Sequence, residues 1–358
     1  RPPTPGLIAA CDQVFGTAPL LSTLLELDGE DQAVRRRALL TTLGAATGLA
    51  GIDGASAVAD LLRHGLLEDS GAVEDWDAVV VDYSRRLVTD PDTAYGTALL
   101  SQLMIARQQM VDRGHTPDRL RAAGYLGHLY GLWQGNQGRI PDAHGWYRSS
   151  TVLADRSGDT AAQVFVRART ASRAIFEGHT VGEVLDGAAA ALAISARPSP
   201  GALEAHSARV HVHALTGDLR SGRTSIGDMI EVAEALPDTP AGPIARTVSF
   251  RHYLESRAGS RRDADRAWAE AEPILRPVPV WWLEARVYQG RALVYDGDVA
   301  DGIVYALDAC RQLPAGIRHI GMAVSDLLSV VPAGYTSDDL DELRTFAAHE
   351  PGPWEMIG

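Results

Sequence analysis

Five glycines divide this chain into segments of nearly equal length. They follow one another at steps of 40, 39, 42 and 38 residues, at Gly138, Gly178, Gly217, Gly259 and Gly297. Each stands where one apolar-patterned segment stops and the next begins. A regular period of about forty residues is typical of solenoids, in which each helical unit buries its apolar face against the next. The sequence therefore predicts stacked helical hairpins, with one of these glycines at each turn.

The residues around the glycines fit such turns. Glycine accepts the left-handed backbone that commonly ends a helix, and polar residues such as Asp218 and Ser260 follow where the next helix needs a cap. Small residues dominate the positions seven before, five after and twelve after the glycines. They predict a close approach of the two helices in each hairpin. A large residue nine positions after three of the glycines (Tyr147, Ile226 and Trp268) is expected to fill the gap between neighbouring hairpins.

This spacing of glycine, small and aromatic residues resembles the tetratricopeptide repeat. The resemblance implies an all-α fold, a right-handed superhelix of helical hairpins in which the first helix of each pair lines a concave groove. We see no alternation that predicts a β-strand. Prolines cluster between the expected hairpins, as at Pro200, Pro243 and Pro279, and mostly spare helix interiors, as stacked helices require.

The start of the chain resembles part of another family. Residues 3–17 resemble the last helix of the helix-turn-helix domain in actinobacterial XRE-type regulators, and the segment Arg35–Leu40 resembles one that follows that domain. In that family a long helical-repeat domain comes next. The resemblance implies that the DNA-reading helix lies before residue 1. It also implies that DNA is contacted only through that N-terminal domain.

These patterns predict four parts of the chain: a helix-turn-helix remnant (1–27), a linker with a short helix (28–70), a tetratricopeptide-like repeat domain (71–350) and a tail (351–358). One segment of the linker has a second interpretation. Three arginines, Arg35 to Arg37, precede an apolar run to Ile52 and resemble a twin-arginine export signal. An ordinary helix with a basic start is favoured, because a patterned segment precedes it and the run is short and rich in Thr and Gly.

Composition limits the functional classes. The chain has 46% hydrophobic and 22% charged residues and a formal net charge of −13, so its own charge disfavours DNA binding. Only Cys11 and Cys310 occur, which suits a reducing cytoplasm and argues against a disulfide scaffold or structural zinc. No segment approaches the ~20 apolar residues that span a bilayer. We expect a cytoplasmic protein without cofactor or membrane partner.

Motifs that would indicate an enzyme are missing. The sequence contains no P-loop, nucleophile elbow, His-Glu-x-x-His or Cys-x-x-Cys pattern, so we expect no catalytic activity. His211 and His213 have the nearest thing to metal-ligand spacing. Residues two apart on a helix point to different faces, which favours one groove histidine beside one surface histidine over a metal site.

The expected first helices are unusually rich in arginine and aromatic residues. Guanidinium groups hold carboxylates or phosphates in two-point contacts, and aromatic faces add flat apolar contact. The alternative is that these arginines lie at solvated edges and pair with the abundant Asp and Glu. Trp281 and Trp282 are a second candidate pair, one for the core and one for the groove or a partner chain. The predicted binding residues are Tyr125, His128, Arg169, Arg173, Arg209, His213, Arg246, Tyr253, Tyr288 and Arg291.

Two functions compete at this stage. The family resemblance implies a ligand- or partner-sensing and dimerisation module of a bacterial transcriptional regulator. It would bind a small anionic molecule or a peptide in the groove and work as a homodimer. The alternative is a protein-interaction scaffold without a small ligand, which grips another chain's helix or tail. A closed pocket with converging arginines favours the sensor, whereas an open, shallow trough favours the scaffold.

Overall fold

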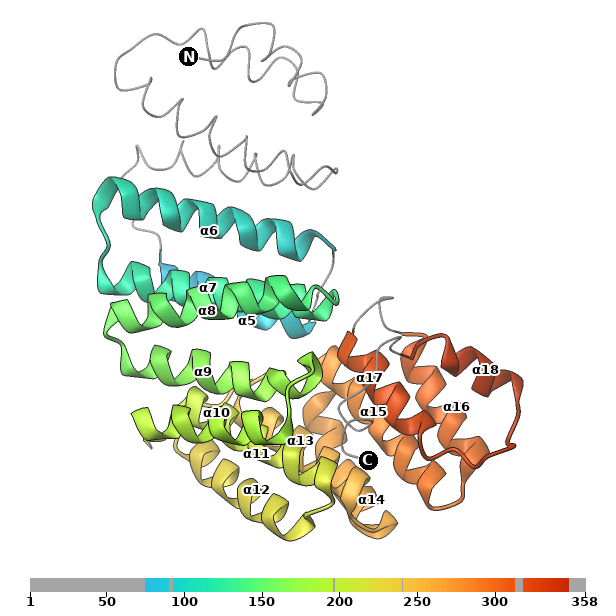
Figure 1. The fold of residues 1–358 in the computed structure, drawn as a ribbon. Coiled ribbons are helices and arrows are strands. Elements are labelled where there is room, and N and C mark those ends of the chain that lie inside the picture. The colour runs from blue at the N-terminus through green and yellow to red at the C-terminus, as the bar shows by residue number, and fades with distance from the viewer. Residues whose placement is uncertain (1–74, 90–92, 196, 240, 313–317, 348–358) are drawn as a thin grey trace, which may run out of the picture. The chain divides into compact units, whose positions relative to one another are not determined.

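Every regular element that the structure describes is a helix. The computed structural model describes residues 75–89, 93–195, 197–239, 241–312 and 318–347. Within them lie fourteen α-helices and one short 3₁₀-helix (Figure 1). The all-α prediction is confirmed for these residues. None of their helices is both long and apolar enough to cross a membrane.

The chain divides into two units. The first comprises residues 1–75 and 93–115, and its described part is essentially α6 (Thr93–Arg113), in which Tyr95 and Leu99 are fully buried. The expected helix-turn-helix remnant (1–27), linker (28–70), arginine run and tail (351–358) lie outside the described residues. The second unit contains α5 and all helices from α7 onward.

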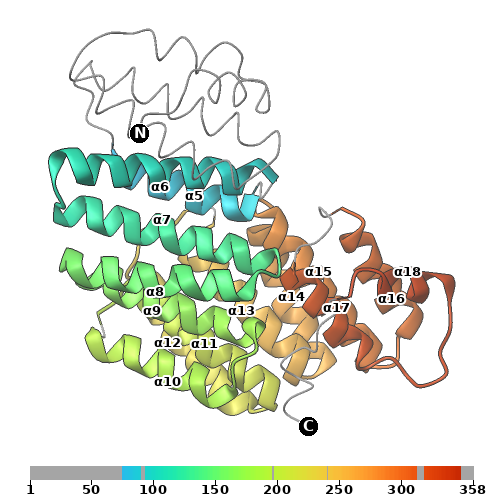
Figure 2. The ribbon, with the colours of Figure 1, turned by 45° about the horizontal axis from the view of Figure 1, so that its top comes forward.

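Helices of the second unit pack in consecutive hairpin-like pairs. The pairs are α7 (Pro117–Asn136) with α8 (Ile140–Ser157), α9 (Thr160–Ala174) with α10 (Val181–Ile194), α11 (Pro200–Thr216) with α12 (Leu219–Glu234), α13 (Pro243–Ala258) with α14 (Arg261–Leu275), α15 (Pro279–Tyr295) with α16 (Val299–Cys310), and α17 (Arg318–Leu328) with α18 (Asp338–Arg344). Each first helix also contacts the first helix of the next pair. The preceding helix α5 (Trp76–Thr89) contacts α7 and α15. Figure 2 shows α7, α8 and α9 side by side.

The turns inside five of these pairs coincide with the five repeat glycines. Four have the expected left-handed backbone, with φ of 76°, 85°, 71° and 106° at Gly138, Gly178, Gly217 and Gly297. Gly259 also follows its helix directly, but its φ is −87°, so the expected left-handed conformation is wrong there. A Cβ at Gly259 would lie 2.5 Å from Oε2 of Glu255, whose carboxylate is held by Arg223. Glycine is needed at this turn for space and not for its backbone angle.

Small residues allow close helix packing, as the sequence predicts. A Cβ on Gly302 in α16 would lie 2.5 Å from the carbonyl oxygen of Gly290 in α15, so these two backbones touch. Tyr147 and Ile226 are buried, and Trp268 is partly buried against the cluster around Leu275. The large residues nine positions after the glycines therefore fill space between helices.

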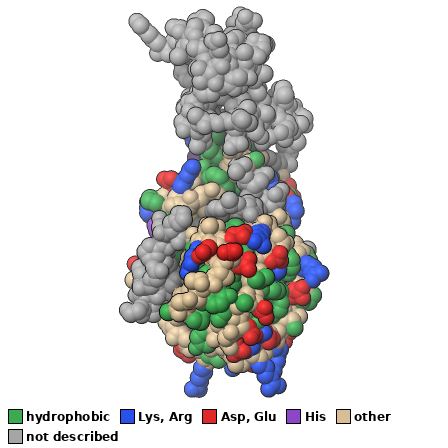
Figure 3. Space-filling model, turned by 90° about the vertical axis from the view of Figure 1, so that its right-hand side faces the viewer, with side chains coloured by type: hydrophobic (Ala, Val, Ile, Leu, Met, Phe, Trp, Pro, Cys, Tyr) green, Lys and Arg blue, Asp and Glu red, His purple; other side chains and the backbone are tan. Residues whose placement is uncertain are grey.

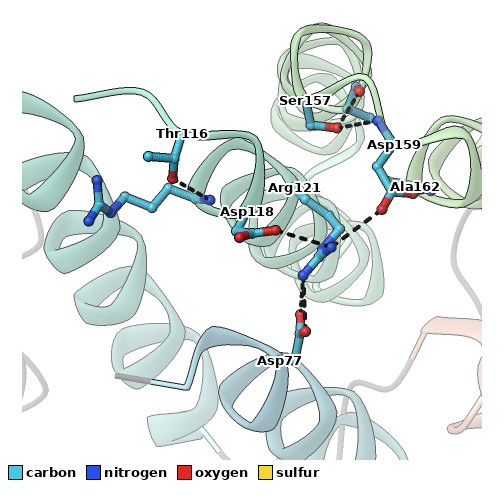
Figure 4. A network of polar contacts seen from close by, with 9 residues as sticks. Asp77, Thr116, Asp118, Arg121, Ser157, Asp159 and Ala162 are labelled. Carbon is cyan, nitrogen blue, oxygen red and sulfur yellow. Dashed lines mark hydrogen bonds and ion pairs between the residues drawn. The ribbon is translucent and has the colours of Figure 1, made fainter. Parts of the chain in front are cut away.

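Polar caps and ion pairs fix the starts of several helices. Thr116 accepts a hydrogen bond from the backbone N–H three residues on and opens α7 (Figure 4). Arg121 in the same helix reaches three carboxylates: it lies 2.9 Å from Asp77 of α5, 3.4 Å from Asp118 and 3.4 Å from Asp159, the N-cap of α9. One guanidinium group thus connects the starts of three helices.

A second group of charges is buried between later helices. Arg257 of α13 and Arg291 of α15 lie 3.1 and 3.0 Å from the carboxylate of Asp326 in α17. Nη1 of Arg291 also donates to the carbonyl oxygens of Ser256 and Arg257, both at 3.3 Å. We call Arg257, Arg291 and Asp326 the Asp326 cluster. On the surface at this end of the unit, acidic, basic and apolar side chains are intermixed (Figure 3).

Candidate ligand pocket

A pocket lies entirely within the second unit. Its lining comes from α5, α7, α9, α11, α13 and α15, with the short segment directly after α9, and the second helices of the pairs contribute no lining residue in the described chain. Its cavity volume is about 70 Å³. Sites for drug-sized ligands typically measure roughly 300–1,000 Å³, so this cavity suits only a small ligand. Arg169, Arg173 and Arg246 line it, together with Phe176, Trp281 and Glu284. We call it the arginine pocket.

Two of the arginines share one carboxylate. Nη1 of Arg169 and Nη2 of Arg246 donate to the same oxygen, Oε2 of Glu204 in α11, at 2.8 and 2.7 Å. Burial alone would raise the pKa of Glu204, but the charges and hydrogen bonds of the two arginines lower it to about 2. Burial lowers the pKa of Arg246 to about 10, so its guanidinium group stays charged at neutral pH. The carboxylate of Glu204 therefore fixes both cations at the pocket wall.

The third arginine is less fully paired. Nε of Arg173 lies 3.5 Å from Oε1 of Glu177, an oxygen that also accepts a hydrogen bond from the Tyr147 hydroxyl at 2.9 Å. The other oxygen of Glu177 lies 3.3 Å from Nε2 of His144. Nε and Nη2 of Arg173 are buried without a hydrogen-bond partner in the described part of the chain. Because buried donors are normally satisfied, this side chain is the least settled of the three.

Aromatic rings flank the cations. The guanidinium carbon of Arg246 lies 4.5 Å from the ring centre of Phe250 and 5.4 Å from that of Trp281. That of Arg173 lies 5.4 Å from the ring centre of Phe176. Arginines held against aromatic faces gain cation–π attraction and lose mobility. The pocket therefore combines fixed positive charge with flat apolar surface.

Glu284 is the acidic group in the lining. Burial raises its pKa to about 7, although Arg246, Arg173 and Arg169 oppose that shift. A carboxyl group with this pKa gains or loses a proton within the physiological range. The charge of the pocket consequently depends on pH near neutrality.

His211 forms another part of the wall. Its ring lies 4.9 Å from Phe176, 4.6 Å from Phe250 and 4.9 Å from Tyr253, measured between ring centres. Burial lowers its pKa to about 3, so the ring is neutral. His213 lies outside the lining and is 3.8 Å from Asp218. No group of three potential metal ligands occurs among residues that the structure describes.

Five of the ten predicted binding residues line the pocket: Arg169, Arg173, Arg246, Tyr253 and Tyr288. Two others pack within α7 and its neighbours. Tyr125 is partly buried with its ring 5.2 Å from Phe165, and His128 is fully buried with its ring 5.0 Å from Tyr147. Burial lowers the pKa of His128 to about 3, so it is a neutral core residue.

The remaining predicted residues are engaged elsewhere. Arg209 points to Asp228 on α12, 3.3 Å away, and is partly exposed. Arg291 belongs to the Asp326 cluster, and His213 contacts the start of α12. Of the tryptophan pair, Trp281 lines the pocket, whereas Trp282 is partly buried with Arg286 over its ring at 5.2 Å.

Sequence analysis did not select Glu204 or Glu284 as site residues. A signal for them exists, because Glu204, Arg246 and Glu284 each stand thirteen positions before a repeat glycine. Arg169, Phe250 and Tyr288 each stand nine positions before one. The two offsets differ by four and so lie on one helix face. Alternating charge at one repeat position therefore indicated a charged inner wall.

Comparison with known proteins adds no family. A scan against protein-family models finds no match to this chain. A search of curated proteins finds no match either.

Proposed function

We propose that the arginine pocket binds a small anionic molecule. The observation that supports this most strongly is the convergence of three arginines, from α9 and α13, on one pocket with aromatic walls. Guanidinium groups recognise carboxylates and phosphates in two-point geometry, and they do so best where water is largely excluded. Lining from six helices suits a compact ligand better than an extended peptide, which favours a sensor over a scaffold.

We propose further that the paired helices wind into a right-handed, tetratricopeptide-like superhelix that converts binding into a change of shape. The pocket is lined by α9, α11, α13 and α15, which belong to four successive pairs. A ligand that contacts several pairs has different affinities for different packing angles and so shifts their equilibrium. Small changes at each pair add along a repeat array.

The regulatory output of this module rests on the resemblance of the first residues to XRE-type regulators. On that basis the protein is a cytoplasmic, homodimeric transcriptional regulator. Its DNA contacts come from the helix-turn-helix domain, and ligand binding repositions those domains on paired half-sites. This part of the proposal is independent of the pocket chemistry and is tested separately, by DNA binding of the full regulator with and without ligand.

Thermal unfolding with simple anions tests the pocket. Benzoate, acetate, phosphate and sulfate are compared with chloride at equal ionic strength, using the parent protein, Arg246→Met and Arg209→Met. An anion at a hundred times its Kd should add about 2.7 kcal/mol of stability to the parent. Arg246→Met should lose the response and Arg209→Met, whose arginine lies outside the pocket, should keep it. The proposal fails if no anion stabilises the parent, or if Arg246→Met responds like it.

A further inference from the structure

The balance of charge around the arginine pocket depends on whether Glu284 is protonated. Three guanidinium groups, those of Arg169, Arg173 and Arg246, face the carboxylates of Glu204 and Glu177. When Glu284 is protonated, three positive groups therefore meet two negative ones. A largely buried charge without a counter-charge is costly. A ligand with a single negative charge balances the site, whereas a doubly charged one would leave an excess negative charge.

We propose that the ligand is an organic monocarboxylate with a flat aromatic ring, and that it binds together with one proton, taken up by Glu284. The inference rests on the proposed function, since it names the class of anion that the pocket accepts.

The shape of the lining supports this class. A carboxylate is planar and presents two oxygens, which match the paired N–H groups of a guanidinium fork. The rings of Phe176, Phe250 and Trp281 lie beside the arginines, within 5.4 Å of their guanidinium carbons, so a ring attached to the carboxylate meets aromatic faces and edges. The cavity of about 70 Å³ limits the ligand to a small molecule.

Proton uptake follows from the position of Glu284. At present Arg246, Arg173 and Arg169 lower its pKa against the effect of burial, which leaves it at about 7. A ligand carboxylate placed among the same arginines offsets their charge and adds a like charge nearby. Both effects favour the protonated form of Glu284. Ligand affinity should therefore fall as the pH rises above about 7, because the proton must be supplied from solution.

Other titratable groups around Glu284 do not change charge in this range. Among the groups that line or adjoin the pocket, those on α9 and α13 are Arg169, Arg173 and Arg246, and those on α11 are Glu204, with its pKa near 2, and His211, with its pKa near 3. The phenols of Tyr253 on α13 and Tyr288 on α15 have raised pKa values. The lining from α5 is Leu87 and Val88, and on α17 Asp326 is paired with Arg257 and Arg291. Glu284 is thus the group in this surrounding that responds to pH near neutrality.

Isothermal titration calorimetry of the whole chain tests the inference. The probes are benzoate, acetate (no ring), benzamide (no charge) and phenyl phosphate (two charges), each at pH 6.5 and pH 8.0. Benzoate should bind at least tenfold more tightly than the other three at pH 6.5. Because it stays ionised at both values, its affinity should fall roughly eightfold at pH 8.0, as expected for uptake by a group with a pKa of about 7. In Glu284→Gln the two affinities should agree within twofold.

The outcomes separate this inference from the proposed function. If phenyl phosphate binds more tightly than benzoate, the monocarboxylate class is wrong, and if acetate does, the aromatic ring is wrong. In both cases the anion pocket stands. If none of the charged probes binds the parent protein, both proposals fail. Proton uptake is also measured directly, from the binding enthalpy of benzoate in two buffers of different ionisation enthalpy. Equal enthalpies in the two buffers overturn the role of Glu284, even if the Gln variant does not fold.

Discussion

The arginine pocket and the Asp326 cluster use similar residues to different ends. In both, one carboxylate holds two arginines: Glu204 holds Arg169 and Arg246, and Asp326 holds Arg257 and Arg291. In the Asp326 cluster, backbone carbonyls of α13 accept further hydrogen bonds from Arg291, which closes the site. Around the pocket a third arginine and several rings face open space instead. The Asp326 cluster thus connects α13, α15 and α17, whereas the arginines of the pocket also face a cavity.

The largest effect is expected in the closed cluster. Asp326→Asn removes the carboxylate that two largely buried guanidinium groups share, and the cost of an uncompensated buried charge should lower the free energy of unfolding by about 3–5 kcal/mol. Urea unfolding measures it. Asp82→Asn, whose carboxylate is 48% exposed and pairs with Arg85, itself 60% exposed, is the control and should change little. Equal losses in the two variants would contradict the assignment of the cluster as a structural tie.

Low pH should remove the stabilisation that the ionised carboxylate of Glu204 contributes. Its pKa is lowered from 4.5 to about 2 in the folded protein, so its contribution is complete above pH 4.5 and is lost as the pH falls to 2. The stability difference between the parent and Glu204→Gln should therefore shrink by roughly 3 kcal/mol between pH 5 and pH 2. Urea titrations at four pH values provide the difference. A gap that is independent of pH would show that Glu204 is not held ionised by the two arginines.

The carboxyl group of Glu284 should have the opposite effect on how stability depends on pH. Because its pKa is raised from 4.5 to about 7, the folded state binds the extra proton and stability falls as the pH rises between these values. Between pH 5 and pH 8, the free energy of unfolding of Glu284→Gln should rise by on the order of 1–2 kcal/mol relative to that of the parent. This is less than the full pKa shift implies, because the side chain is partly solvated. The readout is the same urea series. If the stability difference between the two proteins does not change with pH, the carboxyl group of Glu284 lies in a more polar environment than the pocket provides.

The smallest effect is expected outside both sites. Arg209→Met removes an arginine that is 36% exposed and pairs with Asp228. The free energy of unfolding should therefore change by no more than about 0.5 kcal/mol. Thermal and urea unfolding at pH 7 are sufficient. A loss as large as that of Asp326→Asn would mean that exposed and buried arginine pairs in this array contribute alike, and the comparison between the two clusters would lose its meaning.

The architecture was predictable because it depends on short-range signals. A turn glycine, a small residue where two backbones touch and a capping residue each act within a few positions of the chain. Ser199 and Ser337 accept hydrogen bonds from the N–H groups three residues on, where the sequence suggests helix starts. Gly259 shows the limit, since its φ of −87° is not the left-handed value that a glycine at this repeat position predicts.

The site was harder to predict because it depends on how far each side chain lies from a partner on another pair. Arg209 and Arg246 look alike in sequence, but Arg209 meets Asp228 on the adjoining helix, whereas Arg246 turns inward to Glu204. Arg291 stands six positions before its glycine, as Tyr253 does. It leaves the pocket because α17 supplies Asp326. Composition carries no information about such cross-pair neighbours, and the period indicates the Glu204–Arg246 pair only through the alternating charge at one repeat position.

The separation of lining and non-lining helices has a consequence for how this protein can vary. The pocket wall is built by α5 and by the first helices of five of the six pairs, and the second helices contribute no lining residue in the described chain. Substitutions on the outward faces of α8, α10, α12, α14 and α16 can therefore accumulate, or be engineered for solubility and attachment, without altering ligand choice. The outward faces can therefore be changed without touching the residues that line the pocket.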